Sequence, residues 1–349
     1  MTYRVIHCGT GNVGRHALEA ILRNPDLELV GHYVSSKGKA GKDSGELIGL
    51  PPAGVTATND WADLVALKAD CLIYFGDSMG REAEAIEDLV PFLETGTNVV
   101  TFSGFTLAHP PTTPPAQREM IEDACRTGES TCFFTGIDPG WATTDLAIAA
   151  LAVADQVESV RMSELGYFGM YSAELAMREY FGFGKDESFT PIFVSGGFIE
   201  KNWSPTLYQL AEVLGVQIEE IRLVWDREFA KNDIETGFGT VKAGTCCVVN
   251  FELQALVDGR PVIILEHVDC VTRDIDPKWN RPHANVDLAY RVQVVGKPGF
   301  DLELAFGNDG SLLSAMPVIN AVPAVCEASP GLKSPLDIPR YWSRNRVCG

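Results

Sequence analysis

The chain opens with Tyr3-Arg-Val-Ile-His-Cys-Gly9-Thr-Gly11-Asn-Val-Gly14-Arg15-His-Ala-Leu, which is a short apolar strand, a glycine-rich turn and the beginning of a helix. Gly9 permits a tight turn, Gly11 lets the backbone approach a pyrophosphate, and Gly14 lets the helix pack closely on the strand. The N–H groups of that helix then face the phosphates with the positive end of its dipole. Although such a turn can merely join a strand to a helix, the combination of strand, spacing and helix favours dinucleotide binding. The expected cofactor contacts here are Gly9, Thr10, Gly11, Asn12, Val13 and Gly14.

The loop after the second predicted strand, 27–34, bears on the choice between NAD and NADP. An NAD site usually places Asp or Glu about twenty residues past the glycines, where it accepts from the ribose 2′-OH. The segment 29–40 has no acidic residue. Hydroxyls and lysines stand there instead and suit the charge of a 2′-phosphate, although a lysine-bearing loop can also be simply solvated. The sequence therefore favours NADP, with NAD possible, and the expected contacts are Ser35, Ser36, Lys37 and Lys39.

Composition indicates a packed protein with an acidic balance. The 349 residues are enough for two domains, and 46% hydrophobic with 21% charged residues is ordinary for a soluble protein. The net charge of −19 argues against a nucleic-acid partner, because phosphate backbones need clustered Lys and Arg. The nine cysteines include no C-x-x-C pair, which predicts reduced thiols in a cytoplasmic protein rather than disulfides or a zinc site. No apolar run is long enough to span a membrane and no signal peptide precedes the first strand, so no membrane partner is expected.

Up to residue 143, apolar strands alternate with helical segments, which is typical of a parallel sheet with helices on both faces. Strands are predicted at 4–8, 27–34, 71–75, 98–102 and 131–135, and helices at 15–23, 62–67, 82–94 and 117–126. We therefore predict an α/β chain whose N-terminal Rossmann dinucleotide-binding domain covers 1–143. The C-terminal segment 310–349, with a helix over 310–326, is expected to complete it.

The remaining segment, 144–309, is predicted to form an α+β second domain for substrate binding and dimerisation. Its predicted helices are 144–154, a stretch reaching 184, and 198–214, and its predicted strands are 159–165, 219–227, 244–257, 260–272, 286–296 and 301–307. Consecutive strands joined by turns such as Asp258-Gly259 indicate a mixed, largely antiparallel sheet. One face of such a sheet needs cover, which helices or a second subunit could supply, and a homodimer is favoured.

Further stretches of the chain match a known family. They are Gly41-Lys-Asp-Ser-Gly-Glu-Leu-Ile-Gly49, Thr95-Gly-Thr-Asn-Val-Val100, Gly136-Ile-Asp-Pro-Gly140, Phe181-Gly-Phe-Gly184, Glu266-His267 and Asn320-Ala-Val-Pro323. With the glycine motif, they make the chain resemble the dihydrodipicolinate reductase-like superfamily. Within it, the chain is most similar to the branch of 2,4-diaminopentanoate dehydrogenase and the native NAD(P)H-dependent amine dehydrogenases. The resemblance implies a second domain that is a mixed sheet, forms a homodimer and lies over the nicotinamide.

Two features depart from the family pattern. No counterpart exists to the His/Lys-rich catalytic segment of dihydrodipicolinate reductases, which argues against a lysine-pathway role. In the amine dehydrogenase branch a Glu follows the Asn-Val-Val strand, whereas this chain reads Thr101-Phe102-Ser103-Gly104-Phe105-Thr106-Leu107. The expected function is therefore reduction of C=O, or C=N, in a small, largely hydrophobic substrate. The alternatives are reductive amination, with His109 or a second-domain carboxylate replacing the Glu, and a catalytically silent NADP-binding sensor or scaffold.

Two side chains are candidates for moving the proton that accompanies hydride transfer. Tyr171 lines the substrate pocket by resemblance and can donate to a developing alkoxide, or it is only an aromatic wall. His109 titrates near neutral pH and could replace the missing carboxylate, or it is an exposed loop residue.

Other loops and an aromatic stripe complete the predicted site. Ser103, Asp138 and Pro139 follow strands of the first domain and are expected near the cofactor, because ligands bind beyond the carboxyl ends of parallel strands. His267 is interpreted as a core or interface residue, and no spacing of His, Asp or Glu predicts a metal site. The expected apolar pocket, which suits a hydrophobic ketone, aldehyde or imine, is formed by Phe105, Phe168, Tyr171 and Met177.

Overall fold

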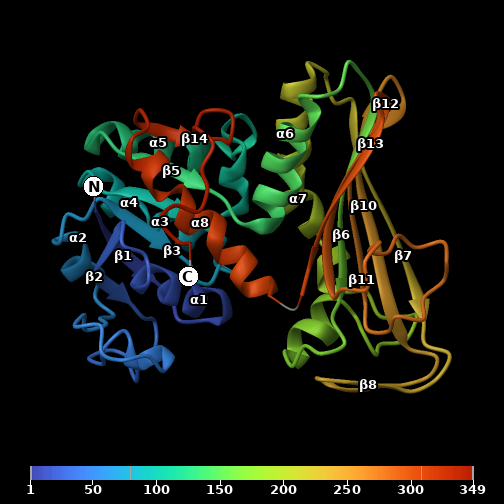
Figure 1. Cartoon of the computed structure of the whole chain (residues 1–349), viewed down its shortest axis with the longest axis horizontal. Helices are drawn as coiled ribbons and strands as arrows, with labels where there is room; N and C mark the ends of the chain where they lie inside the picture. The colour runs from blue at the N-terminus through green and yellow to red at the C-terminus, as the bar shows by residue number, and fades with distance from the viewer. Residues whose placement is uncertain (1, 79, 308, 348–349) are drawn as a thin grey trace. The chain divides into compact units, whose positions relative to one another are not determined.

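The computed structural model describes residues 2–78, 80–307 and 309–347. The chain folds into two compact units (Figure 1). The first unit runs to Trp141 and resumes at Gly310, and the second unit is Ala142–Asp309.

The first unit is built on a six-stranded parallel sheet in the order β14-β5-β4-β3-β1-β2. Its four inner strands are short and almost wholly buried, as expected for a parallel sheet covered on both faces. This confirms the predicted Rossmann-like α/β fold. The strands are β1 (Tyr3–Cys8), β2 (Leu27–Tyr33), β3 (Cys71–Tyr74), β4 (Asn98–Thr101), β5 (Thr131–Phe134) and β14 (Gly331–Lys333). β14 was not predicted, because three residues are too few to show a strand pattern.

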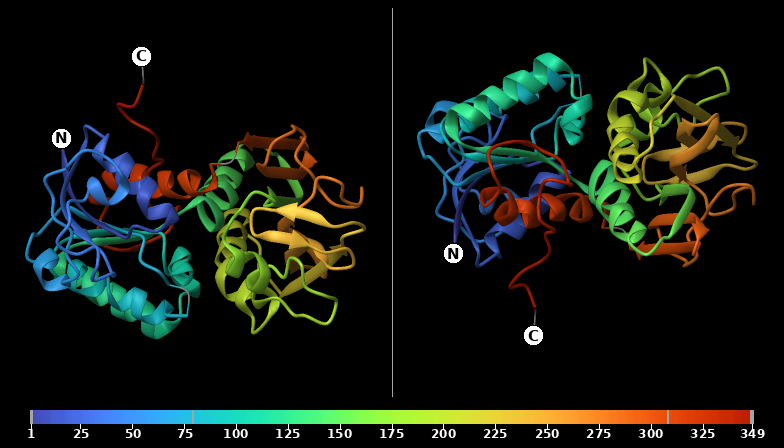
Figure 2. Two further views of the ribbon diagram at one scale, coloured as in Figure 1. Left: turned by 90° about the horizontal axis from the view of Figure 1, so that it is seen from below. Right: turned by 90° about the horizontal axis from the view of Figure 1, so that it is seen from above.

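Helices cover both faces of this sheet (Figure 2). The core on one face contains side chains of α1 (Asn12–Leu22) and α8 (Gly310–Cys326), and the core on the other contains side chains of the remaining helices. Those are α2 (Trp61–Val65), α3 (Glu82–Glu87), α4 (Val90–Glu94) and α5 (Pro115–Gly128). The single helix predicted over 82–94 is wrong, since α3 and α4 are separate. Pro91 explains the break, because it has no N–H to donate to the preceding turn.

The second unit is built on a mixed six-stranded sheet in the order β13-β12-β6-β11-β10-β7. Only β6 and β11 pair in parallel among these strands, and the other pairs are antiparallel. The Asp258-Gly259 turn joins β10 to β11 with positive φ at both residues, 49° and 70°, as a type I′ hairpin requires. The strands are β6 (Gln156–Tyr167), β7 (Glu220–Phe229), β10 (Cys246–Val257), β11 (Arg260–Cys270), β12 (Leu288–Lys297) and β13 (Phe300–Phe306), with a separate hairpin of β8 (Ile234–Thr236) and β9 (Gly239–Val241).

Two helices, α6 (Leu146–Leu151) and α7 (Phe198–Leu214), share one hydrophobic core with this sheet. The helical stretch predicted to reach 184 is wrong in extent, because only 174–180 is helical there. Gly182 and Gly184 both have positive φ, which ends the helix. Among the described residues, no helix has both the length and the apolar character needed to cross a bilayer.

Candidate functional site

The glycine loop of the first unit has the shape that a dinucleotide needs. Gly9 has φ +108°, and a Cβ atom on it would lie 2.7 Å from the Phe75 carbonyl oxygen. A Cβ atom on Gly14 would lie 2.8 Å from the Gly9 carbonyl oxygen, so α1 approaches the turn as closely as it can. A Cβ atom on Gly11, in contrast, would meet open space. Gly11 is also the N-cap of α1 and has no side chain to cover the N–H groups of the first turn. These residues fit a pyrophosphate.

The loop after β2 folds back onto the glycine loop. The Lys39 ammonium donates a hydrogen bond of 2.7 Å to the Thr10 hydroxyl. The residues Ser35, Ser36 and Lys37 are exposed. A positive charge is therefore held at the glycine loop, beside three further polar residues that face solvent.

Asp43 holds the backbone that follows this loop. Its carboxylate accepts backbone N–H bonds of 2.8 Å from Gly45, Ala53 and Gly54. The bond from Ala53 is the largest cause that lowers the pKa of Asp43. The family-like stretch 41–49 is thus a folded support for the loop that carries Lys39.

The candidates that follow β4 and β5 are placed differently from one another. The Ser103 hydroxyl donates to the Gly76 carbonyl at 2.5 Å and so joins the ends of β4 and β3. His109 is buried, 5% exposed, and its Nδ1 lies 2.9 Å from the Thr112 hydroxyl, so it is not the exposed loop residue of the alternative interpretation. Asp138 and Pro139 lie after β5 in extended backbone. Their cofactor contacts, like the catalytic role of His109, stay predictions.

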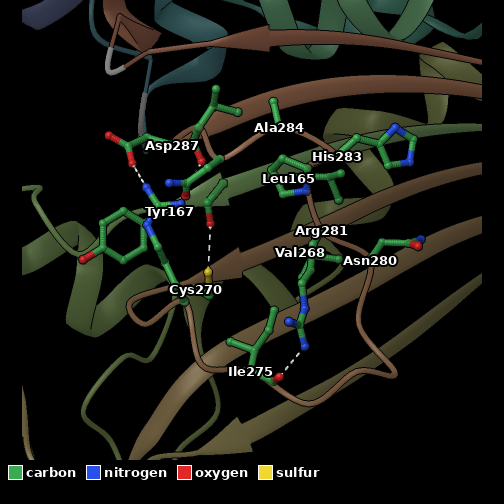
Figure 3. A pocket seen from close by; sticks show the side chains of 15 residues that line it. Leu165, Tyr167, Val268, Cys270, Ile275, Asn280, Arg281, His283, Ala284 and Asp287 are labelled. Atoms are coloured by element: carbon green, nitrogen blue, oxygen red, sulfur yellow. Dashed lines mark hydrogen bonds and ion pairs between the residues drawn. The ribbon is translucent and has the colours of Figure 1, made fainter.

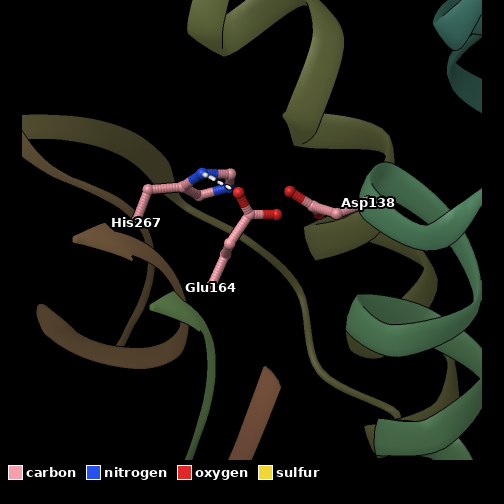
Figure 4. Close-up of side chains that lie close together, drawn as sticks. All are labelled: Asp138, Glu164 and His267. Atoms are coloured by element: carbon pink, nitrogen blue, oxygen red, sulfur yellow. Dashed lines mark ion pairs between the residues drawn. The ribbon is translucent and has the colours of Figure 1, made fainter. Parts of the chain in front are cut away.

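In the second unit, four polar side chains form what we call the polar patch: Glu164, His267, Asp269 and Tyr290. They come from β6, β11 and β12, where the register pairs Glu164 with His267 on one side and with Tyr290 on the other. The Tyr290 hydroxyl donates to Glu164 Oε2 at 2.7 Å. His267 Nδ1 lies 3.9 Å from Glu164 Oε1 and 3.9 Å from Asp269 Oδ2. Figure 4 shows the imidazole ring and the Glu164 carboxylate facing each other.

The polar patch is set among apolar rings. Phe251 stacks on the His267 ring with centroids 4.3 Å apart, and Trp203 meets it edge-on at 5.5 Å. His267, Asp269 and Tyr290 are 6%, 1% and 3% exposed. Burying such groups among apolar side chains costs stability unless they are partnered. Buried polar side chains that depart from ordinary apolar core packing are expected at functional sites.

Tyr171 lies within the electrostatic reach of this patch. Burial raises the pKa of its phenol, and the negative charges of Glu164 and Asp269 raise it further. The phenol therefore stays protonated at neutral pH and can donate a hydrogen bond. Its ring is 4.9 Å from that of Phe168, and both pack against the core cluster that contains Met177.

Three of the four predicted pocket residues are thus brought together in the second unit. The fourth, Phe105, belongs to the first unit. There it packs edge-on against Phe134, with ring centroids 5.6 Å apart.

A cavity of about 280 Å³ in the second unit lies elsewhere (Figure 3). It is lined by Leu165, Val268 and Cys270, which point to the opposite face of the sheet from Glu164 and His267 because side chains alternate along a strand. Its polar groups hold the loop 273–287 in place. Arg273 bonds to the Val286 carbonyl and the Asp287 carboxylate, and Arg281 bonds to the Ile275 carbonyl. This cavity is not lined by Phe168, Tyr171 or Met177.

The polar patch was not predicted as a site. Glu164 is about a hundred residues or more from the other three members along the chain, and only the strand register brings it next to them. The sequence carries one signal of this site. His267 and Asp269 lie on the same face of β11 as Ile263 and Leu265, whose side chains belong to the hydrophobic core. Charged residues in the core phase of a strand are unusual, and they point to a site.

Comparisons with known proteins agree with this architecture. The model of the dihydrodipicolinate reductase N-terminus matches residues 3–100, and the 2,4-diaminopentanoate dehydrogenase C-terminal domain matches residues 144–343. An amine dehydrogenase of Streptomyces virginiae is 30% identical over 95% of this chain and 94% of that protein. The 2,4-diaminopentanoate dehydrogenase of Acetoanaerobium sticklandii is 23% identical over 96% of this chain and 93% of that protein.

A solved structure also shares the fold. The structure of an amine dehydrogenase from Mycobacterium smegmatis has a TM-score of 0.77 and 19% identity, and covers 99% of this chain and 98% of that chain. The chain therefore belongs to the family of oxidoreductases that contains 2,4-diaminopentanoate dehydrogenase and the amine dehydrogenases.

Proposed function

We propose that this protein is an NADP-preferring dehydrogenase that interconverts a small, largely apolar amine and its carbonyl counterpart. The observation that carries the proposal is Glu164, a carboxylate held by Tyr290 at 2.7 Å inside an aromatic setting. The family-like carboxylate after β4 is missing from this chain, and Glu164 supplies a carboxylate from the second unit instead. Amine chemistry needs such a group, because ammonium and water must both lose protons.

The cofactor preference rests on the first unit. The open space over Gly11 at the start of α1 suits the pyrophosphate. The Lys39 ammonium at Thr10, with Lys37 nearby in sequence, suits a 2′-phosphate better than a ribose with free hydroxyls. When bound, the cofactor donates or accepts the hydride.

Glu164 would manage the protons of the reaction. In the oxidative direction, a substrate ammonium gives a proton to the Glu164 carboxylate and becomes a neutral amine, which can release a hydride from its carbon. Glu164 then releases this proton to solvent. The resulting iminium takes up a water molecule, and Glu164 accepts a proton from this water and passes it to the departing nitrogen. Amine, NADP⁺ and water become carbonyl compound, ammonium and NADPH, with one proton released when the amine enters as ammonium. The reductive direction reverses each transfer.

The neighbours of Glu164 have supporting roles in this proposal. Tyr290 fixes one carboxylate oxygen, and the other oxygen faces His267. The buried Asp269 adds negative charge to the polar patch, which favours a cationic ammonium or iminium over a neutral carbonyl compound. Phe168 and Met177 offer apolar surface near Tyr171 for the rest of the substrate.

Simple carbonyl reduction is the second candidate. It is favoured by Tyr171, whose raised pKa keeps a phenol available to donate to a developing alkoxide. This reaction needs no ammonium, so measuring turnover with and without ammonium distinguishes the two candidates.

The proposed role of Glu164 is tested with Glu164→Gln against a matched control, Glu158→Gln, which makes the same change at an exposed position of the same strand. The assay follows NADPH oxidation with a panel of apolar ketones and aldehydes in high ammonium. We expect Glu164→Gln to lower kcat/KM by about 100-fold or more, because a positioned acid–base group contributes that much. Glu158→Gln should change it by no more than about twofold. Wild-type turnover by Glu164→Gln would exclude Glu164 as the acid–base group.

A further inference from the structure

Two buried histidines lie next to the glycine loop. His7 and His32 are register partners on the adjacent parallel strands β1 and β2, and neither is exposed to solvent. Their ring centroids are 5.2 Å apart. Histidine is seldom fully buried, so a pair inside the core of a sheet needs a physical reason.

The hydrogen bonds define the tautomer of each ring. His7 Nε2 lies 2.6 Å from the Gly9 carbonyl oxygen, which can only accept, so Nε2 carries the hydrogen. The Ser44 hydroxyl donates to the Val55 carbonyl and therefore accepts from His32 Nδ1, 3.0 Å away. The other ring nitrogens, His7 Nδ1 and His32 Nε2, are buried without a hydrogen-bond partner among the described residues. Each ring is a neutral imidazole with one N–H in use.

Burial keeps both rings neutral. It lowers the pKa of His7 to about 3, with a smaller contribution from the neighbouring His32. Burial also lowers the pKa of His32 to about 4. At neutral pH the pair therefore adds no charge beneath the loop. The pair acts on the loop through the hydrogen bond from His7 to Gly9.

This hydrogen bond determines the orientation of a peptide group in the loop. The Gly9 N–H donates to the Tyr33 carbonyl at 3.1 Å, and the Gly9 carbonyl accepts from His7, so Gly9 is held on both sides. The C=O and N–H of a planar trans peptide point in opposite directions. With the Gly9 carbonyl turned toward the buried ring, the Thr10 N–H points away from it.

We infer that His7 is a positioning residue for the dinucleotide: it holds the Gly9 carbonyl inward, so that the Thr10 N–H faces the pyrophosphate. His32 packs against the His7 ring and keeps it in place. The inference rests on the cofactor site of the proposed function. Without the donor, the partly buried Gly9 carbonyl loses its hydrogen bond to His7, which costs free energy. Rotation of the peptide toward solvent relieves that cost and withdraws the Thr10 N–H.

The test compares three single variants of the full chain. His7→Phe keeps a ring but removes the donor, and His7→Gln restores an N–H donor on a side chain of similar reach. Tyr3→Phe is the matched control, because it removes one hydrogen bond, to Glu327, from the other end of β1. The dissociation constant of NADPH is measured by fluorescence, and circular dichroism establishes that each variant is folded. Adenosine 2′-monophosphate, which lacks the pyrophosphate, serves as a second probe in competition.

We expect His7→Phe to raise the NADPH Kd about tenfold, with His7→Gln and Tyr3→Phe within about threefold of wild type. The affinity for adenosine 2′-monophosphate should be the same in all four proteins. Wild-type NADPH affinity in His7→Phe overturns the inference, and so does an equal loss in Tyr3→Phe, in His7→Gln or for adenosine 2′-monophosphate. If wild type binds neither NADPH nor NADH, the cofactor site itself is refuted. Normal wild-type binding with unchanged His7→Phe refutes only the role of His7.

Discussion

The glycine loop and the polar patch are two opposite ways of building a site. The glycine loop consists of six consecutive residues, 9–14, whose backbone conformation and close packing shape an open space at the start of α1. The polar patch takes its residues from three strands and depends on the register between them. The glycine loop depends on backbone atoms and on the absence of side chains, whereas the polar patch depends on buried side chains.

The two sites should therefore be sensitive to different substitutions. In the glycine loop, an added methyl group is the damaging change, because the space itself is the feature. In the polar patch, the loss of one oxygen or nitrogen is damaging, because each group is positioned by its neighbours. Removing Glu164 should therefore affect chemistry and not cofactor binding. Changes in the glycine loop should affect cofactor binding first.

Alanine at Gly11 and alanine at Gly14 should have different consequences, and Gly11→Ala should have the largest effect on cofactor binding. Gly11→Ala places its methyl group in open space at φ −71°, which an L-residue adopts readily, so stability should be unchanged. The methyl group then obstructs the pyrophosphate, and we expect the NADPH Kd to rise about 30-fold or more, equivalent to about 2 kcal/mol. Titration of the folded variant with NADPH measures this.

Gly14→Ala sharpens the contrast. Its methyl group would lie 2.8 Å from the Gly9 carbonyl oxygen, so the unfolding free energy should fall by about 1–3 kcal/mol. Urea unfolding measures the unfolding free energy of both variants. Equal stability losses in Gly11→Ala and Gly14→Ala would contradict the distinction between open and packed glycines.

A smaller effect is expected at the loop after β2. Replacing Lys37 and Lys39 together with alanine removes the charges proposed to bind the 2′-phosphate, and charge-assisted hydrogen bonds contribute about 1.5 kcal/mol or more each. The NADPH Kd should rise about 10-fold or more while the NADH Kd changes by no more than about threefold. Parallel titrations with the two cofactors provide the measurement. Equal weakening of both would mean that the lysines do not select NADP.

The smallest effect concerns the pH dependence of stability. His7 has a folded pKa of about 3, below the value of 6.5 expected when unfolded. Above pH 6.5 neither state is protonated. As the pH falls from 6.5 toward 3, only the unfolded state binds the proton, so stability is lost at up to about 1.4 kcal/mol per pH unit. His7→Gln removes this group, and its unfolding free energy should fall less steeply between pH 6.5 and 5. Urea unfolding at both pH values tests this, and an identical slope in the two proteins would argue against a neutral buried His7.

Much of the first unit could be predicted because its signals are local. The strands β1 to β5 are apolar runs bounded by turn residues, and the glycine motif follows directly on β1. The elements of this unit that were predicted wrongly or not at all also have local causes. Pro91 divides one predicted helix, and β14 is too short to show a pattern.

The candidate site in the second unit could be predicted only in part. Phe168, Tyr171 and Met177 lie within ten residues, and they do come together. Tyr290 and Glu164 are 126 residues apart, and their hydrogen bond exists only because β12 and β6 pair in one register. A shift by one residue would point Tyr290 to the other face of the sheet. Alternating apolar residues identify strands, but they do not specify which strands are neighbours.

Isotope incorporation tests directly whether this enzyme works at a carbon–nitrogen bond. Wild-type protein is incubated with NADPH, an apolar ketone panel and ¹⁵N-labelled ammonium, and the products are analysed by mass spectrometry. We expect amine product that carries ¹⁵N, together with NADPH consumption that requires ammonium. An unlabelled alcohol formed at the same rate with or without ammonium would contradict chemistry at a carbon–nitrogen bond and establish carbonyl reduction instead.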